Sequence, residues 1–355
     1  MIECFFKIVY NTVCKRLHAV ELRGRMLILA TIKQVAKLAG VSVATVSRVL
    51  NDSGYVQRET RKKVEEAIKE LEYIPNEVAR SLYRKESRLV GLLLPDITNP
   101  FFPELARGVE DELQKEGYHL LFGNSDEKLE KELSYIQTFV QNNVVGVISA
   151  TNLADKSNYE HLSIPTVFLD RAQTSEYYVV SDGKEGGRIA ARELIKRGSE
   201  NITVLKGPSH VLPAIERFQG TIEILAQSNV DFQVISTSSF SFQEAKVWAK
   251  EIFEKYPDTD GIIASNDITA TAILHEALTR GKVIPDELQI IGFDDIQQSS
   301  LLFPSLSTIR QPIYEMGKEA ATLLIALIKR QKIEQSQIKL AVSFVERNTT
   351  RKVKE

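Results

Sequence analysis

The sequence predicts an N-terminal all-α helix-turn-helix head followed by an α/β body of two parallel-sheet lobes. Two observations carry this prediction. Up to about residue 71, apolar residues recur at helical spacing. From Leu89 onward, short apolar runs with the length of buried strands alternate with amphipathic helical segments. Repeated strand–helix units imply parallel sheets covered by helices, and about 265 residues of this pattern is large for one sheet, which indicates two similar lobes.

The head begins with a helix that has one apolar face, formed by Ile32, Val35, Ala36 and Ala39. Gly40 ends this helix, because glycine tolerates the left-handed backbone that a helix stop needs. Ser42 is then placed to cap the next helix by accepting a hydrogen bond from a free backbone amide. The spacing predicts a helix, a tight turn and a second helix within residues 31–51.

The second helix has an inner face formed by Val46, Val49 and Leu50. Its opposite face carries small residues, hydroxyls and one arginine, namely Val43, Ala44, Thr45, Ser47 and Arg48. A face of this kind fits the DNA major groove. The spacing alone is equally compatible with an ordinary two-helix corner inside a core, so the DNA-binding interpretation depends on further features.

A third helix is predicted over residues 58–71, where apolar residues again recur at helical spacing. Three short helices with a shared apolar face form a small bundle. Pro75 ends the helical pattern, and the segment Asn76–Tyr83 has too few apolar residues to bury much surface. Such a segment is either a solvated linker or an element that folds against a partner.

The net charge of −2 hides an asymmetry along the chain. Residues 31–88 hold 12 Lys and Arg against 8 Asp and Glu, residues 1–30 hold 5 against 2, and the remainder therefore carries −9. A basic head on an acidic body fits a head that meets phosphate, although chance clustering of surface charge explains the same numbers.

Residues 1–30 form an extension that we expect to be disordered or not translated, with translation starting at Met26. Its apolar run is too short and too charged to span a membrane, and no small-residue cleavage site follows it. Both cysteines, Cys4 and Cys14, lie in this extension, so neither a disulfide framework nor a cysteine-based metal site is expected. These features predict a cytoplasmic protein with no membrane partner, and DNA binding by the head would make it nucleoid-associated.

The body alternates strands and helices in a regular order. Strands are predicted at residues 89–95, 119–123, 144–149, 166–170, 178–181, 202–206, 233–236, 261–265 and 289–293. Helices are predicted at residues 104–115, 128–141 and 185–197, and after the strands that end at 206, 236 and 265.

Polar and aromatic side chains follow four of these strands, where ligands bind in open parallel sheets. Carboxylates and amides can bind neighbouring hydroxyls, and aromatic faces can cover the C–H surface of a sugar ring. The set favours a small polyhydroxylated ligand, although any single Asp or Asn at a strand end is explained as well by loop capping. Its members are Asp96, Thr98, Asn99, Phe101 and Phe102 after the first strand, then Asp170 and Arg171, Asn266 and Asp267, and Asp294 and Asp295.

Catalytic motifs are missing from the sequence. It contains no phosphate-binding P-loop, no GxGxxG motif and no nucleophile elbow, and its five histidines lack metal-ligand spacing. We therefore predict a protein that is not an enzyme, with no catalytic residue, no metal and no cofactor. Two other classes stay open. The absence of a secretory signal and the basic head argue against a transport-associated sugar-binding protein, and a sugar-processing enzyme would show turnover.

Together these residues resemble the LacI/GalR family of bacterial transcription regulators, over residues 31 to about 350. The most specific matches are VSVATVSRVLN at 41–51, TRKKV at 60–64, YIPN at 73–76 and ARSL at 79–82. The resemblance implies a homodimer on a palindromic double-stranded operator, with residues 76–83 as a hinge helix in the minor groove and Leu82 as an apolar wedge. The DNA-binding residues that it implies are Thr31, Ser42, Val43, Ala44, Thr45, Ser47, Arg48, Asn51, Asn76, Ala79, Arg80 and Leu82.

The body resembles the sugar-binding domain of this family, which shares its fold with periplasmic binding proteins. The string PDITNPFFP at residues 95–103 is especially typical of ribose-responsive members, so the resemblance implies D-ribose as effector. Another pentose or hexose, a purine, corepressor coupling and a phosphoprotein coregulator stay open. The effector-binding residues that it implies are Asn99, Phe101, Phe102, Asp170, Arg171, Arg217, Phe240, Asn266, Asp294 and Gln311.

We therefore expect a repressor of a sugar-utilisation operon that the sugar releases from its operator. The expected domains are the extension 1–30, a DNA-binding domain at 31–74, a hinge helix or linker at 75–87 and an effector-binding and dimerisation domain at 88–355. In the last of these, lobe one is expected at about 88–198 and 312–334, and lobe two at about 199–311 and 335–350.

Overall fold

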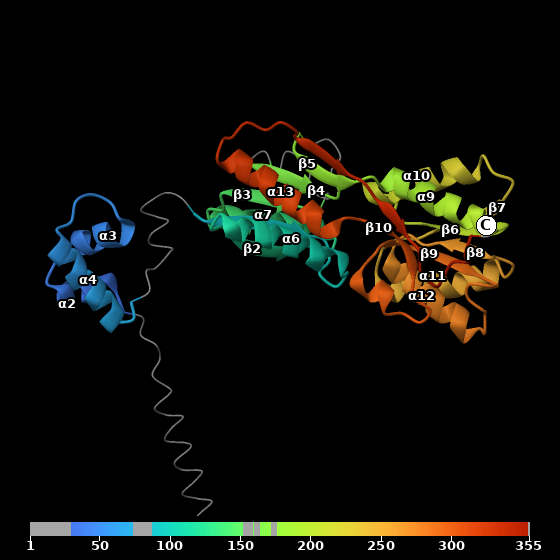
Figure 1. The fold of residues 1–355 in the computed structure, drawn as a ribbon, viewed down its shortest axis with the longest axis horizontal. Coiled ribbons are helices and arrows are strands. Elements are labelled where there is room, and N and C mark those ends of the chain that lie inside the picture. Colours follow the sequence, from blue (N-terminus) through green and yellow to red (C-terminus); the bar gives the residue numbers. More distant parts are fainter. Residues whose placement is uncertain (1–29, 74–86, 152–158, 160–163, 172–175, 354–355) are drawn as a thin grey trace, which may run out of the picture. The chain divides into compact units, whose positions relative to one another are not determined.

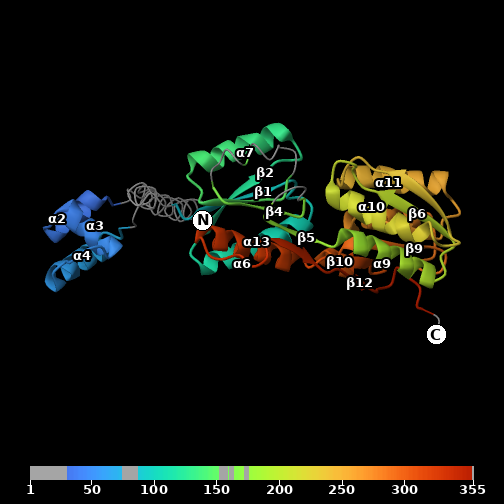
Figure 2. The same ribbon diagram turned by 90° about the horizontal axis from the view of Figure 1, so that it is seen from above.

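The computed structural model describes residues 30–73, 87–151, 159, 164–171 and 176–353. The chain divides into two compact units, Met1–Lys85 and Glu86–Glu355, whose elements are labelled in Figures 1 and 2. The predictions for the extension and for the hinge helix fall almost entirely outside the described residues.

The first unit is a head of three helices, α2 (Ile32–Ala39), α3 (Val43–Asn51) and α4 (Arg58–Glu70). One apolar face from each helix forms a shared core, so the predicted helix-turn-helix head is confirmed. The buried members of this core are Val35, Ala36, Ala39, Val46, Val49, Val64 and Ala67.

Side-chain and glycine caps fix where the first two helices begin and end. The Thr31 amide donates to Gln34 Oε1 at 2.7 Å, and the Gln34 amide donates to Thr31 Oγ1 at 3.4 Å, which forms a capping box. Gly40 ends α2 in the left-handed region, with φ 66°. Ser42 Oγ then accepts the Thr45 amide at 3.1 Å. These caps set the start of α3 and therefore the face that α3 exposes.

The first lobe of the second unit has a fully parallel sheet in the order β11-β5-β4-β3-β1-β2. Its first strand is an unbroken apolar run that is buried along nearly its whole length, as expected when helices cover both faces. Helices α6 (Phe101–Lys115) and α13 (Ile313–Ile328) cover one face and α7 (Leu129–Gln141) covers the other (Figure 2). The strands are β1 (Leu89–Leu94), β2 (His119–Asn124), β3 (Gly146–Ser149), β4 (Thr166–Leu169), β5 (Tyr178–Ser181) and β11 (Gln337–Leu340).

The second lobe repeats this plan with the strand order β12-β10-β9-β8-β6-β7, in which only the β10–β12 pair is antiparallel. Helices α9 (Gly183–Lys196) and α10 (Leu212–Leu225) lie on one face, and α11 (Phe242–Lys255) and α12 (Asp267–Thr279) lie on the other (Figure 1). A short 3-10 helix, η1 (Gln297–Ser300), follows β9. The strands are β6 (Asn201–Lys206), β7 (Asp231–Ser236), β8 (Gly261–Ile263), β9 (Gln289–Asp294), β10 (Ser307–Arg310) and β12 (Ser343–Val345).

The chain passes between the lobes three times, after β5, after β10 and after β11. Two expected lobe boundaries are therefore wrong. Helix α9 packs on α10 and on the second sheet, so residues 183–196 belong to lobe two. Strand β11 pairs with β5, so residues 337–340 belong to lobe one. Alternating strands and helices predict parallel sheets, but they do not say which sheet each element joins.

Candidate functional site

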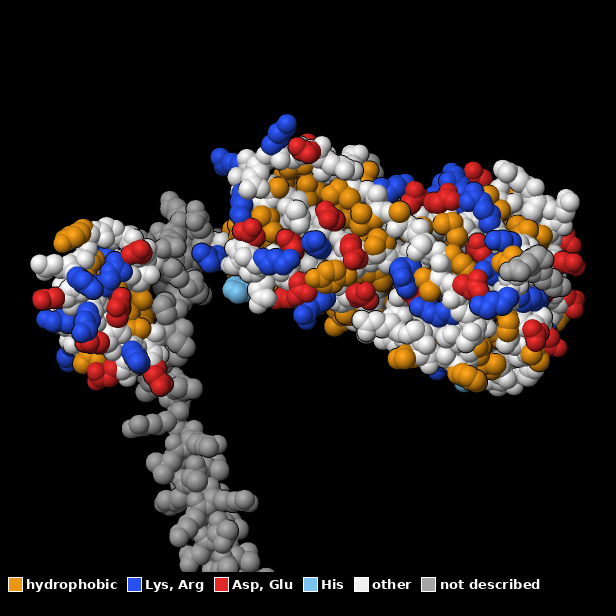
Figure 3. Space-filling view, viewed as in Figure 1, with side chains coloured by type: hydrophobic (Ala, Val, Ile, Leu, Met, Phe, Trp, Pro, Cys, Tyr) orange, Lys and Arg blue, Asp and Glu red, His pale blue; other side chains and the backbone are white. Residues whose placement is uncertain are grey.

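Helix α3 exposes a polar face on the head. Ser42, Val43, Ala44 and Arg48 are exposed, and Val43 keeps 41% of its surface accessible although it is apolar. On the visible face of the head, Lys and Arg side chains lie among Asp and Glu (Figure 3). An exposed helix face with a valine and an alanine at its start and an arginine in its last turn can contact base edges and phosphates.

The other predicted DNA-binding residues of the head lie at the margin of this face. Thr31 is exposed, whereas Thr45, Ser47 and Asn51 are only half-exposed. Asn51 Nδ2 donates to Ser47 Oγ at 3.3 Å, and Thr45 is paired with Ser42 through their hydroxyls at 2.9 Å. These bonds hold the polar side chains in fixed positions. The four remaining predicted residues, Asn76, Ala79, Arg80 and Leu82, lie outside the described residues.

The second unit contains a cavity of about 360 Å³ between its two lobes. It lies at the carboxyl ends of the strands, which is where the sequence predicts the ligand. Nine of the ten predicted effector-binding residues line it, namely Asn99, Phe101, Phe102, Asp170, Arg171, Arg217, Phe240, Asn266 and Asp294. The tenth, Gln311, lies behind the cavity wall.

Arg171 is the buried cation of the lobe-one wall. Its backbone follows Asp170, which adopts the left-handed region with φ 64°. The guanidinium is only 4% exposed, donates from Nη2 to Glu127 Oε1 at 2.8 Å and lies 5.9 Å from the centre of the Phe102 ring. Its buried Nε has no hydrogen-bond partner among the described residues, so one donor of this arginine is left unused by them.

Arg217 and Asp294 form the charged centre of the lobe-two wall. Arg217 Nη1 donates to the Ser265 carbonyl at 3.0 Å, its Nη2 lies 3.5 Å from Asp294 Oδ1, and its guanidinium stacks 3.9 Å from the centre of the Phe293 ring. Burial raises the pKa of the Asp294 carboxyl, and Arg217 partly opposes this shift. Burial likewise raises the pKa of Asp170. Both carboxyls therefore bind a proton more readily than an ordinary aspartate.

Two asparagines reach the cavity from helix starts. Asn266 Oδ1 accepts the Thr269 amide at 2.9 Å and thereby caps α12. Its buried Nδ2 has no hydrogen-bond partner among the described residues. Asn99 Oδ1 accepts the Phe101 amide at 3.1 Å and holds the start of α6. The next residue, Phe102, packs edge-to-face on Phe101 with ring centres 5.0 Å apart. The cavity therefore combines apolar ring surface with free amide and guanidinium donors.

Gln311 supports the cavity rather than lining it. Its Nε2 donates to Asp294 Oδ1 at 2.6 Å, and its Oε1 accepts from Ser181 Oγ, so it fixes the Asp294 carboxylate from behind. Asp267, the neighbour of Asn266, also turns away from the cavity. It accepts bonds from the Ile296 amide, Ser299 and Thr308 at 3.0, 2.7 and 2.6 Å, which tie α12 to the segment after β9 and to β10.

Eight further residues line the cavity, namely Asp96, Asp126, Glu127, Val211, Pro213, Ser239, Ser241 and Glu244. Asp96 belongs to the strand-end set that predicts a polyhydroxylated ligand, although it is not among the residues that the family resemblance implies. Asp126 and Glu127 follow the end of β2, so the strand-end rule that found the other carboxylates applies to them too. The five lobe-two residues lie in loops and at helix starts for which the sequence carries no comparable signal.

Other site types find no support in the part of the chain that the structure describes. No group of three or more His, Cys, Asp and Glu side chains there is placed to hold a metal ion. None of the helices described is both long and apolar enough to cross a membrane.

Comparisons with known proteins agree with this architecture. The model of bacterial regulatory proteins of the lacI family matches residues 31–76, and that of the periplasmic binding protein-like domain matches residues 191–350. The ribose operon repressor of Bacillus subtilis (strain 168) is 60% identical over 324 residues, which cover 91% of this chain and 99% of that protein. The chain belongs to the lacI family.

Solved structures of lacI-family regulators share both units or the body alone. The lac repressor dimer bound to operator and the anti-inducer ONPF matches with a TM-score of 0.81 at 25% identity, over 90% of this chain and 99% of that one. A LacI family transcriptional regulator from Enterococcus faecium with bound ribose matches with a TM-score of 0.67 at 29% identity, over 74% of this chain and 98% of that one. The predicted family and the predicted fold are therefore confirmed.

Proposed function

We propose that this lacI-family protein is a repressor that binds operator DNA as a homodimer and releases it when D-ribose fills the cavity of its body. The observation that carries this proposal is the cavity itself, where the predicted sugar-binding side chains of both lobes converge. The 60% identical relative is named a ribose operon repressor, and the Enterococcus faecium structure holds ribose, which supports the same effector.

The chemistry of the cavity suits a sugar ring. Asp294 and Asp170 offer carboxylate acceptors to ring hydroxyls, while Asn266 and Arg171 offer unpartnered donors to ring oxygens. The rings of Phe101 and Phe102 provide a surface for the C–H groups of the sugar. Because these residues come from both lobes, a bound sugar stabilises the arrangement in which the lobes close on it.

DNA recognition is assigned to the head. The exposed face of α3, with Val43, Ala44 and Arg48, would lie in the major groove, and the segment 76–83 with Leu82 would enter the minor groove. We infer that the protein acts as a cytoplasmic binding protein at the nucleoid rather than as an enzyme. A phosphoprotein coregulator stays an open part of the proposal.

The test is a calorimetric titration of D-ribose into the full chain, with D-xylose, D-fructose and adenine as competitors of different chemistry. We expect saturable ribose binding that the other compounds do not match, followed by loss of operator binding in a DNA-binding assay with ribose present. Ribose recovered unchanged after incubation would support binding without turnover. Absence of ribose binding would overturn the effector assignment, and absence of operator binding would overturn the repressor assignment.

A further inference from the structure

The cavity is rich in negative charge. Six acidic residues line it against only two basic ones, Arg171 and Arg217, which gives a formal charge of −4. If the two buried carboxyls of Asp170 and Asp294 carry protons, the charge is still −2. A cleft of one sign with low-dielectric walls focuses its field and opposes a ligand of the same sign. The six are Asp96, Asp126, Glu127, Asp170, Glu244 and Asp294.

Both guanidinium groups of the cavity already have carboxylate neighbours. Arg171, at 4% exposure, is paired with Glu127 at 2.8 Å, and Arg217 lies 3.5 Å from Asp294 while donating to a backbone carbonyl. Phosphate recognition by arginine depends on an unneutralised fork that can meet two anionic oxygens. Neither arginine offers one here, whereas single donors such as Arg171 Nε remain for uncharged oxygens.

Three of the helix starts around the cavity are occupied as well, whereas α10, which begins beside the lining residues Val211 and Pro213, has no side-chain cap. A free helix N-terminus binds phosphate because its first amides lack partners. At this cavity, Asn266 caps α12 at 2.9 Å and Ser241 caps α11 at 3.4 Å, with the Glu244 carboxylate in the first turn of α11. Asn99 covers the first amide of α6 at 3.1 Å. At each of these three helix starts, one amide that could bind phosphate is therefore taken by a side chain of the protein.

We propose that this cavity accepts an uncharged sugar and rejects its phosphorylated form, and that Glu127 is the residue that decides between them. This inference rests on the proposed sugar-binding function and adds the charge class of the ligand. Glu127 acts in two ways. It neutralises Arg171, the most buried cation of the cavity, and it adds a carboxylate of its own to the wall.

The backbone around Glu127 is held in an unusual conformation. Asp126 and Glu127 both lie in the left-handed region, with φ 51° and 53°, although neither is glycine. Asp126 is anchored by Lys131 and Asn124, which keeps the turn in place. Such consecutive left-handed residues persist only where the surroundings hold them, and their effect is to direct the Glu127 carboxylate onto Arg171.

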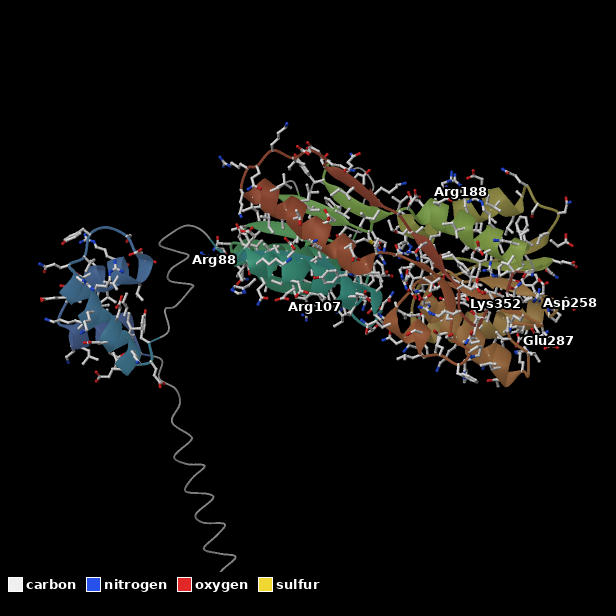
Figure 4. The ribbon with its side chains drawn as sticks, viewed as in Figure 1. Arg88, Arg107, Arg188, Asp258, Glu287 and Lys352 are labelled. Atoms are coloured by element: carbon white, nitrogen blue, oxygen red, sulfur yellow. The ribbon has the colours of Figure 1, made fainter. Side chains whose placement is uncertain are left out.

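The experiment compares three ligands: D-ribose, D-ribose 5-phosphate and 5-O-methyl-D-ribose, which has the same blocked position and no charge. The full-length protein, its Glu127→Gln variant and its Asp258→Asn variant are titrated with each ligand. Asp258 is an exposed carboxylate at the end of the second lobe, away from the first lobe (Figure 4), so its variant removes one charge outside the cavity. Thermal melting of both variants checks that they fold.

We expect the unmodified protein to bind the phosphate at least about 100-fold more weakly than the methyl ether. In Glu127→Gln, the affinity ratio of methyl ether to phosphate should fall about tenfold, and in Asp258→Asn this ratio should stay the same. The same affinity ratio should also fall at about 1 M salt, where the Debye length is about 3 Å. This is expected because the ratio depends on the charge of the ligand and not on its size.

Three results would overturn the inference. Equal binding of phosphate and methyl ether would show that charge plays no part. If Glu127→Gln left the affinity ratio of methyl ether to phosphate unchanged, Glu127 would not be its cause. If salt left this ratio unchanged, electrostatics would not be its cause. These results are distinct from failure of the proposed function, in which the protein would bind none of the three ligands and the inference would fall with it.

Discussion

The two arginines of the cavity differ in how much of their hydrogen-bonding capacity the protein itself uses. Arg217 has a carbonyl, a carboxylate and an aromatic ring 3.9 Å away as partners. Among the described residues, Arg171 has one carboxylate partner, Glu127, and a more distant ring, Phe102, at 5.9 Å. A ligand adds most hydrogen bonding to a buried guanidinium when the protein itself supplies few partners. At the scale of single residues, Arg171 is therefore the side chain on which we expect sugar affinity to depend most.

Replacing Arg171 with Ala removes a buried donor and leaves Glu127 without its partner. We expect ribose affinity to fall by about 10- to 150-fold, as for loss of a hydrogen bond from a charged group, with operator binding unchanged. Calorimetry and a DNA-binding assay measure the two effects. Arg107→Ala is the matched control, because Arg107 is 70% exposed on the outside of α6 (Figure 4). A ribose response equal to that of the control would exclude Arg171 from the site.

Ribose affinity should increase with pH. Burial raises the pKa of Asp294 in the free protein, so part of the carboxyl is protonated where an ordinary aspartate is ionised. Sugar hydroxyls donate to the ionised form and favour it, so binding releases a proton. We expect the affinity to rise as pH passes upward through the raised pKa and then to level off. Calorimetry across this range, with Asp294→Asn as the variant that cannot titrate, measures the effect.

The raised pKa of Asp294 affects the stability of the free protein in the opposite direction: stability falls as pH rises, whereas ribose affinity increases. The folded-state pKa of Asp294 exceeds the unfolded one, so its contribution to stability is fully present below the unfolded pKa and is lost as pH rises through the folded pKa. Melting temperatures of Asp294→Asn should therefore fall less with rising pH than those of the unmodified protein. Identical pH profiles of the two proteins would contradict the assignment for both affinity and stability.

At the scale of elements, close helix crossings set the position of cavity residues. A Cβ atom at Gly187 in α9 would lie 2.0 Å from the Arg217 carbonyl oxygen in α10, and one at Gly220 would lie 1.8 Å from the Lys184 carbonyl oxygen. Two glycines therefore let α9 and α10 touch through their backbones. Since Arg217 belongs to α10, this crossing positions a cavity residue from outside the cavity.

Gly187→Ala should push α10 away from α9 and move Arg217 relative to Asp294. We expect a loss of stability of about 1–3 kcal/mol from overpacking, together with weaker ribose binding. Gly183→Ala is the control in the same helix, because its Cβ would meet no atom closer than 3.5 Å. Thermal unfolding and ribose titration compare the two. If Gly187→Ala behaved like Gly183→Ala in both measurements, the crossing would have no role in placing Arg217.

The elements themselves were largely predictable from the sequence, because buried parallel strands are apolar runs and the helices between them are amphipathic. The predicted strand at 178–181 matches β5 at both ends. Arg217 and Phe240 came from family resemblance alone. Glu127 escaped prediction, since its contact with Arg171 depends on two left-handed residues for which the sequence has no glycine. Local pattern does not show such long-range pairs.

At the scale of the whole body, the three chain segments that join the two lobes lie close to the residues of the cavity. Gln311 lies in the connection from β10 to α13, and it bonds both to Asp294 of lobe two and to Ser181 at the end of β5. A change in the angle between the lobes must therefore act on connections that contact the cavity wall. This arrangement gives a bound sugar a direct means to favour one lobe arrangement over another.

If that lobe arrangement governs operator binding, ribose and operator must weaken each other by the same factor. We expect this factor to be about 5- to 150-fold, the usual range for such coupling. Operator affinity is measured with and without saturating ribose, and ribose affinity with and without saturating operator. The two ratios should agree, because both describe one free-energy difference between the same four states. Ribose that left operator affinity unchanged would show that the cavity and the head are uncoupled, and ribose that tightened it would make the sugar a corepressor.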